Sequence, residues 1–488
     1  MLLSRQSPPR GLRWRSSTSF IISTISMAMF TDLFLYGLIV PTLPFILSNR
    51  LHLPSHEMQK SISLLLSFYG GASVLICLPA GYIADLLPSR QPSFLFGLSA
   101  MFLSTVLLWI GQSWRALVIA RIFQGFSAAV VWSVGLAMIL DTVGNSRLAV
   151  VLNGIFGFIC AGELIAPVVG GIIYEALGEG WVFGIGFMLL TIDLILRVFV
   201  VEKKVVKRNG WEVTTPTKID ISPDETAPLL SSSEVANSLA KSYSENELSE
   251  WKLPKDAGHW QMRIPIFYLA STTPRLLTSL ALCFTHAMTL AIFDATIPIQ
   301  SLKLFSFTSR SAGLLFIPLL LPYLLLSPVA GLLVNRYGSK LLASLGLLFL
   351  ATSLLFFGMV HTALPGQENY VIEVTKYSLV LVGCGIGLAA IGSQSLVDAS
   401  IVIENYEKAN PDWFPNGGPY AQLYAMNSMM FSFGLTIGPL AAGYFNVKFG
   451  YAIMNYSLAG WCVLISMLCA LSLGGAPKVL IRALNSKK

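Results

Sequence analysis

Two acids embedded in long apolar stretches are the strongest candidates for chemistry in this sequence. Asp32 lies midway along the stretch 18–46, and Asp294 lies toward the end of the stretch 275–299. An ionisable side chain is costly in an apolar medium, so each acid is a functional candidate by default. Removal from water favours the protonated form of a carboxyl group. Such an acid could hold a proton on one side of a barrier and release it on the other, and its charge would attract an organic cation.

A proton and an organic cation would compete for the same carboxylate. A carrier loaded with either one could reorient, whereas a carrier with a bare charged acid would reorient poorly. This competition is a minimal mechanism for exchanging the two species. The alternative for each acid is a structural hydrogen bond to a neighbouring helix.

Four further polar residues lie in apolar stretches. Arg121 needs an acid or backbone carbonyl groups as partners, because an unpaired guanidinium would be costly there. Gln124, about one helical turn further, is expected to line the same face. Glu163 and His286 are ambiguous, since a lone histidine on an apolar helix is more often packed or hydrogen-bonded than a proton relay.

The composition identifies the medium around these residues. Hydrophobic residues make up 54% of the 488 residues and charged residues only 12%, which is outside the range of soluble domains. A helix needs about 20 apolar residues to cross the hydrocarbon core of a membrane. The sequence therefore predicts an all-α membrane protein with twelve transmembrane helices. We place them at residues 18–46, 61–84, 92–112, 115–141, 149–173, 180–201, 275–299, 310–334, 338–360, 375–401, 419–445 and 451–474.

The distribution of cations predicts the orientation of these helices. Most of the 32 Lys and Arg residues fall on one side if the N-terminus is placed in the cytosol. The positive-inside rule therefore favours cytosolic placement of both termini. This distribution explains the net charge of +7 without a nucleic-acid partner. The six cysteines lie in predicted spans without metal-like spacing, so neither disulfides nor a metal site is expected.

A short motif occurs once in each half of the chain, at residues 81–90 and 331–340. Each copy begins with a glycine at the end of an apolar stretch, has a polar residue four positions later, and has a cation nine positions later. The residues concerned are Gly81, Asp85 and Arg90 in the first copy and Gly331, Asn335, Arg336 and Lys340 in the second. Each copy is expected to form a charged cytosolic hairpin between two helices, which we interpret as a gating loop.

The first copy has a possible ionic partner elsewhere. Arg90 could reach Asp141, at the cytosolic end of another predicted helix, and we expect this pair to hold one conformation closed. The second copy has Asn335 in place of the acid Asp85. We therefore expect the stronger ionic contact in the first half.

The repeat divides the chain into two six-helix bundles, 18–201 and 275–474, with tails at 1–17 and 475–488. The segment 202–274 is rich in polar residues and cannot bury enough apolar surface to fold, so a disordered cytosolic linker is expected. A short amphipathic helix at the membrane surface is expected near residues 260–269, before the second bundle.

The linker contains a candidate sorting signal. Glu225, Leu229 and Leu230 have the spacing of an acidic dileucine signal, to which a sorting adaptor could bind. The alternative is that they are ordinary linker residues. The sequence leaves both the plasma membrane and an internal membrane, such as that of the vacuole, open as destinations.

A second pair of motifs places small residues and a proline within two helices. The residues are Gly162, Pro167, Gly170 and Gly171 in the first half and Gly434, Gly438 and Pro439 in the second. Small residues let helix backbones approach closely, and a central proline removes a backbone hydrogen bond and bends the helix. Helices of this kind suit a protein whose halves move against each other.

Together these motifs resemble the major facilitator superfamily (MFS), and specifically its drug:proton antiporter branch. Residues 81–90 are similar to its loop between helices two and three, residues 121–129 to its helix-four motif, and residues 162–171 to its antiporter-associated helix-five motif. Pro88 and Ala166 replace usual glycines. The resemblance covers nearly the whole chain outside the linker and implies the MFS fold with alternating access.

The spacing around Asp32 and Asp294 resembles that in vesicular amine transporters and their fungal relatives. The resemblance implies that both acids face a central cavity and that Asp32 is the partner of Arg121; a static tie between helices is the alternative for Arg121. This chain has Gly392 and Ser428 where those transporters carry further acids. Their monoamine specificity and proton stoichiometry are therefore not carried over.

The leading hypothesis is a proton-coupled antiporter that exports a small cationic or amphiphilic compound or loads it into an acidic organelle. The proton gradient would supply the energy, and no cofactor is expected. The alternatives are a facilitator or symporter of a neutral or anionic metabolite and, from another class, a non-transporting membrane sensor. An enzyme is not expected, because the sequence lacks a nucleotide-binding loop, metal-spaced His or Cys residues and an Asp-rich pyrophosphate motif.

Overall fold

The computed structural model describes residues 9–86, 89–211, 251–253, 265–392, 394–411, 413–414 and 419–474. Within these ranges the regular structure is entirely helical. The first half contains α1 (Leu12–Arg15), α2 (Thr18–Ile39), η1 (Val40–Thr42), α3 (Leu43–Leu51), α4 (Ser55–Leu86), α5 (Gln91–Ile110), α6 (Trp114–Val143), α7 (Asn145–Leu177), α8 (Glu179–Phe199) and α9 (Lys203–Arg208). The second half contains α12 (Pro265–Thr272), α13 (Pro274–Phe305), α14 (Ser309–Leu314), α15 (Phe316–Tyr337), α16 (Ser339–Leu355), η2 (Phe356–Met359), α17 (Tyr370–Gly392), α18 (Gln394–Ala409), α19 (Tyr420–Phe449) and α20 (Tyr451–Ser472).

Eleven helical segments in the described ranges are long and apolar enough to cross a membrane. The first of them, Thr18–Leu51, combines α2, η1 and α3, with Pro41 in the 3₁₀ turn that joins them. Helix α19 lies outside these eleven segments. It is 30 residues long and packs extensively against α4 and α13, but polar side chains such as Asn427 lower its hydropathy. Eleven of the twelve predicted spans are thus found by length and composition, and α19 occupies the position of the remaining one.

Glycines set the tight turns between several consecutive helices. Gly144, Gly178, Gly338 and Gly450 have φ angles of 73°, 86°, 87° and 88°. Each lies between two helices that follow each other directly in the sequence. Side chains other than glycine rarely adopt this backbone conformation, so these positions favour short, sharp reversals at the ends of the bundles.

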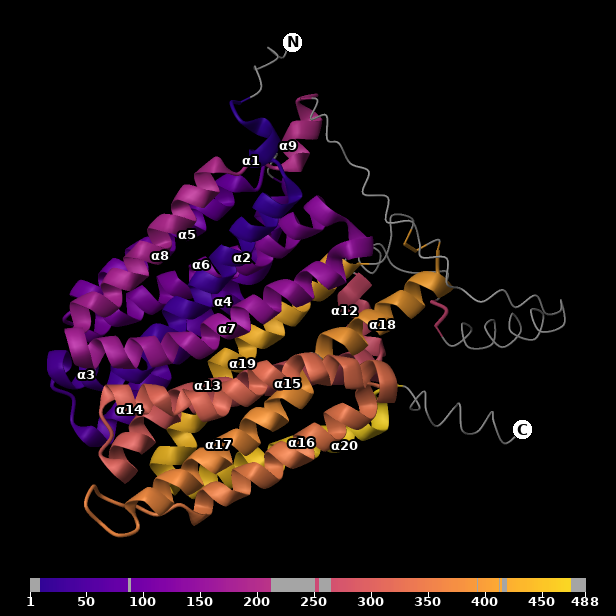
Figure 1. Cartoon of the computed structure of the whole chain (residues 1–488). Helices are drawn as coiled ribbons and strands as arrows, with labels where there is room; N and C mark the ends of the chain where they lie inside the picture. Colours follow the sequence, from indigo (N-terminus) through magenta and orange to yellow (C-terminus); the bar gives the residue numbers. More distant parts are fainter. Residues whose placement is uncertain are drawn as a thin grey trace, which may run out of the picture.

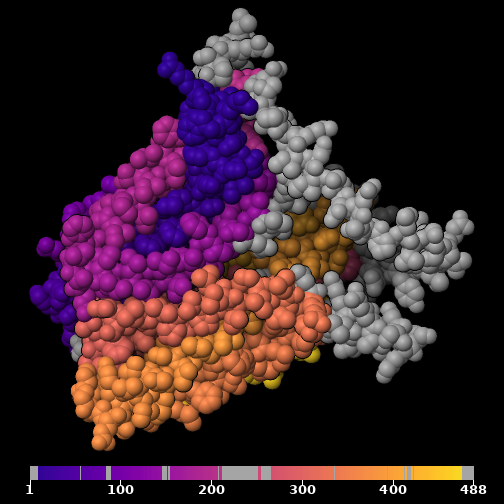
Figure 2. Space-filling view, in the orientation of Figure 1, coloured from indigo at the N-terminus to yellow at the C-terminus, as the bar shows by residue number. Residues whose placement is uncertain are grey.

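The two halves form two bundles that meet along a seam (Figures 1 and 2). Figure 1 shows them close together at the end that carries α3 and α14, which we call the closed end. They diverge toward the end that carries α9, α12 and α18, which we call the splayed end. The first and last described segments both lie at the splayed end, where the Arg15 Nε donates to the Phe199 carbonyl oxygen (2.7 Å) and an Arg275 nitrogen donates to the Gly474 carbonyl oxygen (3.3 Å).

Three buried amide side chains join the two halves at the closed end. The Gln59 Nε2 of α4 donates to the Ala295 carbonyl oxygen of α13 (2.9 Å). The Asn446 Nδ2 of α19 donates to the Gln59 Oε1 (3.0 Å), and the Gln300 Nε2 of α13 donates to the Asn446 Oδ1 (3.1 Å). We call this group the amide network. Because Gln59 belongs to one half and its partners to the other, the network must break if this end opens.

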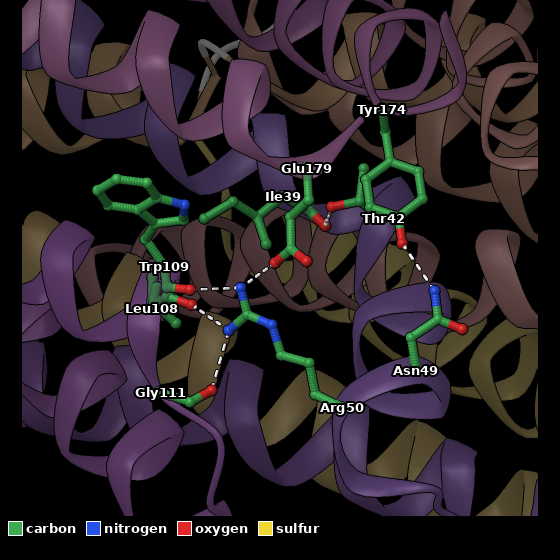
Figure 3. A network of polar contacts seen from close by, with 9 residues as sticks. All are labelled: Ile39, Thr42, Asn49, Arg50, Leu108, Trp109, Gly111, Tyr174 and Glu179. Carbon is green, nitrogen blue, oxygen red and sulfur yellow. Dashed lines mark hydrogen bonds and ion pairs between the residues drawn. The ribbon is translucent and has the colours of Figure 1, made fainter. Parts of the chain in front are cut away.

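Arg50 anchors the end of α3 inside the first bundle (Figure 3). Its Nη1 donates to the carbonyl oxygens of Leu108 (2.7 Å) and Gly111 (2.9 Å), and its Nη2 forms an ion pair with Glu179. The guanidinium thus satisfies carbonyl groups at the C-terminal end of α5 while it holds the start of α8. Arg50 therefore fixes the closed end of this bundle as a rigid unit.

The segment 202–274, expected to lack structure, is helical at both of its ends. Helix α9 lies within it, and α12 packs the buried side chains of Ile266 and Leu269 against α18. These apolar residues explain why the second end can fold onto the bundle. The candidate sorting residues Glu225, Leu229 and Leu230, the first half of residues 260–269, and the tail 475–488 lie outside the described residues, whereas residues 265–269 belong to α12.

Candidate functional site

A small cavity lies between the two bundles, near the middle of the long helices. Its volume is about 20 Å³, which is room for about one water molecule. Its polar lining residues are Tyr36, Glu163 and Asp294, and the others are mainly Leu and Phe side chains from α2, α13, α15 and α19. We call it the central cavity.

Two acids from opposite halves face each other across this cavity. Asp294 comes from α13 and Glu163 from α7, and both side chains are partly exposed. Their carboxyl groups are close enough to interact electrostatically, and neither forms an ion pair with a cation within the described ranges. The Tyr36 hydroxyl also interacts electrostatically with Asp294, without a hydrogen bond of normal geometry. The site therefore holds two carboxyl groups that form no ion pair with a cation in the part of the chain that the structure describes.

Asp32 occupies a different position, inside the first bundle. Only 1% of its surface is exposed. Its Oδ2 accepts hydrogen bonds from the Trp132 Nε1 of α6 (3.0 Å) and from the Tyr69 hydroxyl of α4 (3.3 Å). The Tyr69 and Tyr36 rings lie 4.8 Å apart, so aromatic side chains connect Asp32 to the central cavity that Tyr36 lines. Asp32 does not line that cavity itself, in contrast to Asp294.

The expected pairing of Arg121 with Asp32 is absent. Arg121 is fully buried and donates through Nη1 to the Gln124 Oε1 (2.7 Å), and its guanidinium lies 5.9 Å from the centre of the Tyr36 ring. The reason is distance along α6. Asp32 is held by Trp132, eleven residues from Arg121, which corresponds to about 16 Å of helix rise. Gln124 lies on the same face as Arg121, as predicted, and is its direct partner.

Comparison with known proteins decides the family. The sequence profile of the Major Facilitator Superfamily matches residues 25–410. The chain belongs to the major facilitator superfamily. It is 37% identical over 470 residues to the MFS-type transporter ppzB of Metarhizium rileyi (strain RCEF 4871), with 94% of this chain and 96% of that protein covered. The MFS resemblance and fold expected from the sequence are therefore confirmed.

More distant relatives are also transporters. The chain is 23% identical over 375 residues to the synaptic vesicular amine transporter of Homo sapiens. The aligned region covers 76% of this chain and 59% of that protein. A crystal structure of a D-xylose-proton symporter superposes with a TM-score of 0.63 at 14% identity, covering 94% of this chain and 98% of the other. This MFS protein is thus a multi-pass membrane protein and a secondary transporter, in a family of transporters rather than enzymes.

The motif glycines of the transporter lie where helices touch. A Cβ at Gly438 of α19 would lie 2.6 Å from the Met288 carbonyl oxygen of α13. A Cβ at Gly171 of α7 would collide with the Ser309 carbonyl oxygen of α14, in the other half. The remaining motif residues lie on the same two helices: Gly162, Pro167 and Gly170 on α7, and Gly434 and Pro439 on α19. The small size of the glycines therefore permits close packing of the helices, and at Gly171 that packing joins the two halves.

The expected contact between Arg90 and Asp141 is present. The Arg90 Nε lies 2.9 Å from the Asp141 Oδ2, with Arg90 at the start of α5 and Asp141 near the end of α6. Both helices belong to the first bundle, so this ion pair does not itself join the two halves. Gly81 lies near the end of α4, and the side chain of Asp85 lies outside the described part of the chain. The sequence reading missed Glu202, which accepts from the Ser89 hydroxyl and the Gln91 backbone N–H (2.7 Å each).

The second copy of the repeat differs from the first. Within the described ranges, Arg336 lies beside the Tyr337 ring and Lys340 forms no ion pair, while Gly331 has open space around it. The second bundle instead contains a bidentate pair between Arg275 and Asp398 (3.0 and 2.7 Å). Of the two copies of the repeat, the first therefore carries the ion pair, and the acid that pairs in the second bundle lies on α18, outside the repeat.

Reversal of one charge in the Arg90–Asp141 pair should slow transport. The replacement Asp141→Arg places two cations together, and a loss of about 1 kcal/mol corresponds to a roughly fivefold slower rate. The double variant Arg90→Asp with Asp141→Arg should recover most of the initial uptake rate. Equal amounts of folded protein, measured by fluorescence-detected gel filtration, are the control. A double variant as slow as the single one would show that the pair itself is not what matters.

Proposed function

We propose that this transporter is a proton-coupled antiporter of small cationic or amphiphilic organic compounds. The observation that carries the proposal is the placement of Asp294 and Glu163, from opposite halves, at one central cavity, where neither forms an ion pair among the described residues. The surrounding apolar side chains suit the hydrocarbon part of an amphiphilic molecule. Similarity to a protein named as an amine transporter supports a cationic substrate.

Exchange follows from the electrostatics of this pair of acids. Two carboxylates in an apolar cavity cannot both stay charged at low cost, so the site binds either a proton or an organic cation. Closing the bundles around an unbalanced negative charge would be unfavourable, because the low-dielectric interior penalises it. The empty, deprotonated carrier should therefore return slowly, which couples the two fluxes.

A substrate of drug size cannot fit the cavity in this conformation. Such ligands need about 300–1,000 Å³, far more than the roughly 20 Å³ present here. Entry requires the bundles to separate further at the splayed end, and release requires the closed end to open. The glycine contact at Gly171 and the amide network hold that end shut.

Weakening the amide network should favour opening of the closed end. The replacement Gln59→Ala removes hydrogen bonds to both Ala295 and Asn446, each worth about 0.5–1.5 kcal/mol. A cysteine in place of the buried Ser63, in a protein lacking its six native cysteines, should then react roughly tenfold faster with a membrane-impermeant maleimide. The same cysteine beside intact Gln59 is the control. Unchanged reactivity would show that the network does not hold the closed end.

The direction of the pH gradient that drives accumulation separates this proposal from the alternatives. In proteoliposomes with an acidic interior, an antiporter accumulates organic cations, and dissipation of the pH gradient with an ionophore stops accumulation. A panel of cations, neutral compounds and anions should be tested under both gradient directions. Accumulation only of neutral or anionic compounds, driven by external acid, would instead identify a symporter.

We further propose that both ends of the chain are cytosolic and that the protein resides in the plasma membrane or a vacuolar or other internal membrane. The splayed end, with the basic α9, would then face the cytosol. If the dileucine signal binds a sorting adaptor, Leu229→Ala with Leu230→Ala should move a fluorescent fusion to a different membrane. The paired replacement of Ser231 and Ser232 by alanine is the control, and unchanged localisation of the dileucine variant would contradict a sorting role.

A further inference from the structure

A second cavity lies wholly inside the first bundle, away from the central cavity. Its volume is about 10 Å³, close to the space occupied by one water molecule. Helices α2, α5, α6 and α8 enclose it, and the lining residues include Thr31, Asp32, Ser127 and Asp193. We call it the inner cavity. It brings Asp32 together with Asp193, which is 161 positions away in the sequence.

Four buried oxygen atoms of the lining residues lack partners. The Thr31 Oγ1, Asp32 Oδ1, Ser127 Oγ and Asp193 Oδ1 have no hydrogen bond within the described ranges, and the four residues are at most 2% exposed. Each unsatisfied buried group costs about 1–3 kcal/mol. One water molecule can make up to four hydrogen bonds, so it would satisfy these atoms together. The arrangement has the size and the partners that a bound water needs.

The charged groups nearby do not neutralise both acids. Arg197, one turn from Asp193 on α8, lies with its guanidinium 3.3 Å from the centre of the Phe94 ring and donates to the Met138 sulfur (3.6 Å). Arg197 interacts electrostatically with Asp193 and with Glu202, although no ion pair joins Arg197 and Asp193 within the described ranges. On α6, Arg121 donates to its own neighbour Gln124. Of the lining residues, those from α5 are uncharged.

The other oxygen of Asp32, Oδ2, has hydrogen-bond partners of its own. It accepts from Trp132 and Tyr69, and the Tyr69 ring lies against Tyr36, which lines the central cavity. Asp32 therefore has one oxygen for the inner cavity and one connected, through two tyrosines, to the site of Asp294. Through these tyrosines, a change of charge in the central cavity can affect Asp32 in the inner cavity without direct contact between the substrate and Asp32.

We propose that the inner cavity is a proton-binding site in which Asp32 and Asp193 share one proton through a bound water. This proposal rests on the proposed proton-coupled function and gives it a second proton position, separate from the substrate. The proton enters from water and leaves to water, and no bond other than O–H forms or breaks. Two carboxyl groups that line one small apolar cavity, with a bound water between them, can hold a single shared proton.

Infrared spectroscopy of the full-length protein tests the shared proton without any transport assay. The carboxylic-acid C=O band is followed through a pH titration in wild type, Asp32→Asn, Asp193→Asn and the double variant. A shared proton predicts that each single variant moves the titration of the remaining acid by at least about one pH unit, a tenfold change in proton affinity. It also predicts strongly non-additive effects in the double variant. Asp141→Asn, at the end of α6, is the matched control and should leave this band unchanged.

Other outcomes are equally decisive. If each single variant removes one band and leaves the other acid's titration unchanged, the acids are independent and the proposal is wrong. If sodium chloride, but not choline chloride, shifts the wild-type titration, the cavity is a sodium site instead. If Asp193→Asn does not fold, Ser127→Ala must still shift the band, since it removes one partner of the water. If the wild type shows this coupled titration but no proton-coupled transport, the proposed function is wrong. The inference of a shared proton in the inner cavity then still holds.

Discussion

Replacement of Asp294 by asparagine should abolish proton-driven uptake of the substrate. The asparagine amide has nearly the same shape but cannot take up a proton or carry the charge that a cation needs. Removal of one partner from a buried charged interaction costs about 2–5 kcal/mol, so uptake should fall roughly 30-fold or more. The measurement is the initial rate of uptake into proteoliposomes with an acidic interior.

Replacement of Glu163, the second acid of the cavity, provides a comparison for the uptake by Asp294→Asn. Because Glu163 shares the cavity, Glu163→Gln should also reduce uptake, and the double variant should be little worse than Asp294→Asn alone. Glu404→Gln is the matched control, since Glu404 is an exposed acid that pairs with Lys408 (2.6 Å) and such pairs contribute little. Full proton-driven uptake by Asp294→Asn would exclude the assigned role of Asp294.

Replacement of Asp398 by asparagine should strongly destabilise the second bundle. This fully buried carboxylate accepts two hydrogen bonds from Arg275, one from the Ser279 hydroxyl (3.0 Å) and one from the Ser339 hydroxyl (2.8 Å). It thereby ties α13, α16 and α18 together. Removal of its charge leaves the Arg275 guanidinium without its counter-ion, at a cost of about 3–5 kcal/mol.

Thermal unfolding of the purified protein measures this effect. Asp398→Asn should unfold at a clearly lower temperature than wild type, whereas Ser279→Ala, which removes one neutral donor, should lower it much less. A double replacement of Arg275 and Asp398 by apolar residues of similar volume should recover part of the loss, because no unpaired charge remains. Wild-type stability of Asp398→Asn would contradict a structural role for the network.

The sequence was most informative where a pattern is local. The apolar stretches, the two repeats and the position of Asp294 on its helix follow from composition and spacing along one helix. The contact between Arg90 and Asp141 could also be predicted, because both lie at helix ends on the same side of the membrane. Both residues fall within the predicted first bundle, 18–201, and the contact lies within that bundle in the structure.

The remaining parts of the site depend on packing between distant segments. Glu163 shares a cavity with Asp294 only because α7 and α13 line it from the two halves, and Asp193 shares the inner cavity with Asp32 only because α8 packs beside α2. The resemblance implies the wrong partner for Arg121, because the packing of α6 against α2 places Trp132 rather than Arg121 beside Asp32. The amide network around Gln59 gave no signal, since isolated Gln and Asn residues in apolar helices form no recognisable motif.

Proton movement driven by substrate alone tests the central claim most directly. Proteoliposomes are loaded with an organic cation that the protein transports, diluted into substrate-free buffer at equal pH on both sides, and followed with an internal pH-sensitive dye. Antiport predicts that outward substrate flow acidifies the interior, and that Asp294→Asn removes this signal. Substrate efflux without any pH change, or with alkalinisation of the interior, would contradict proton-coupled antiport.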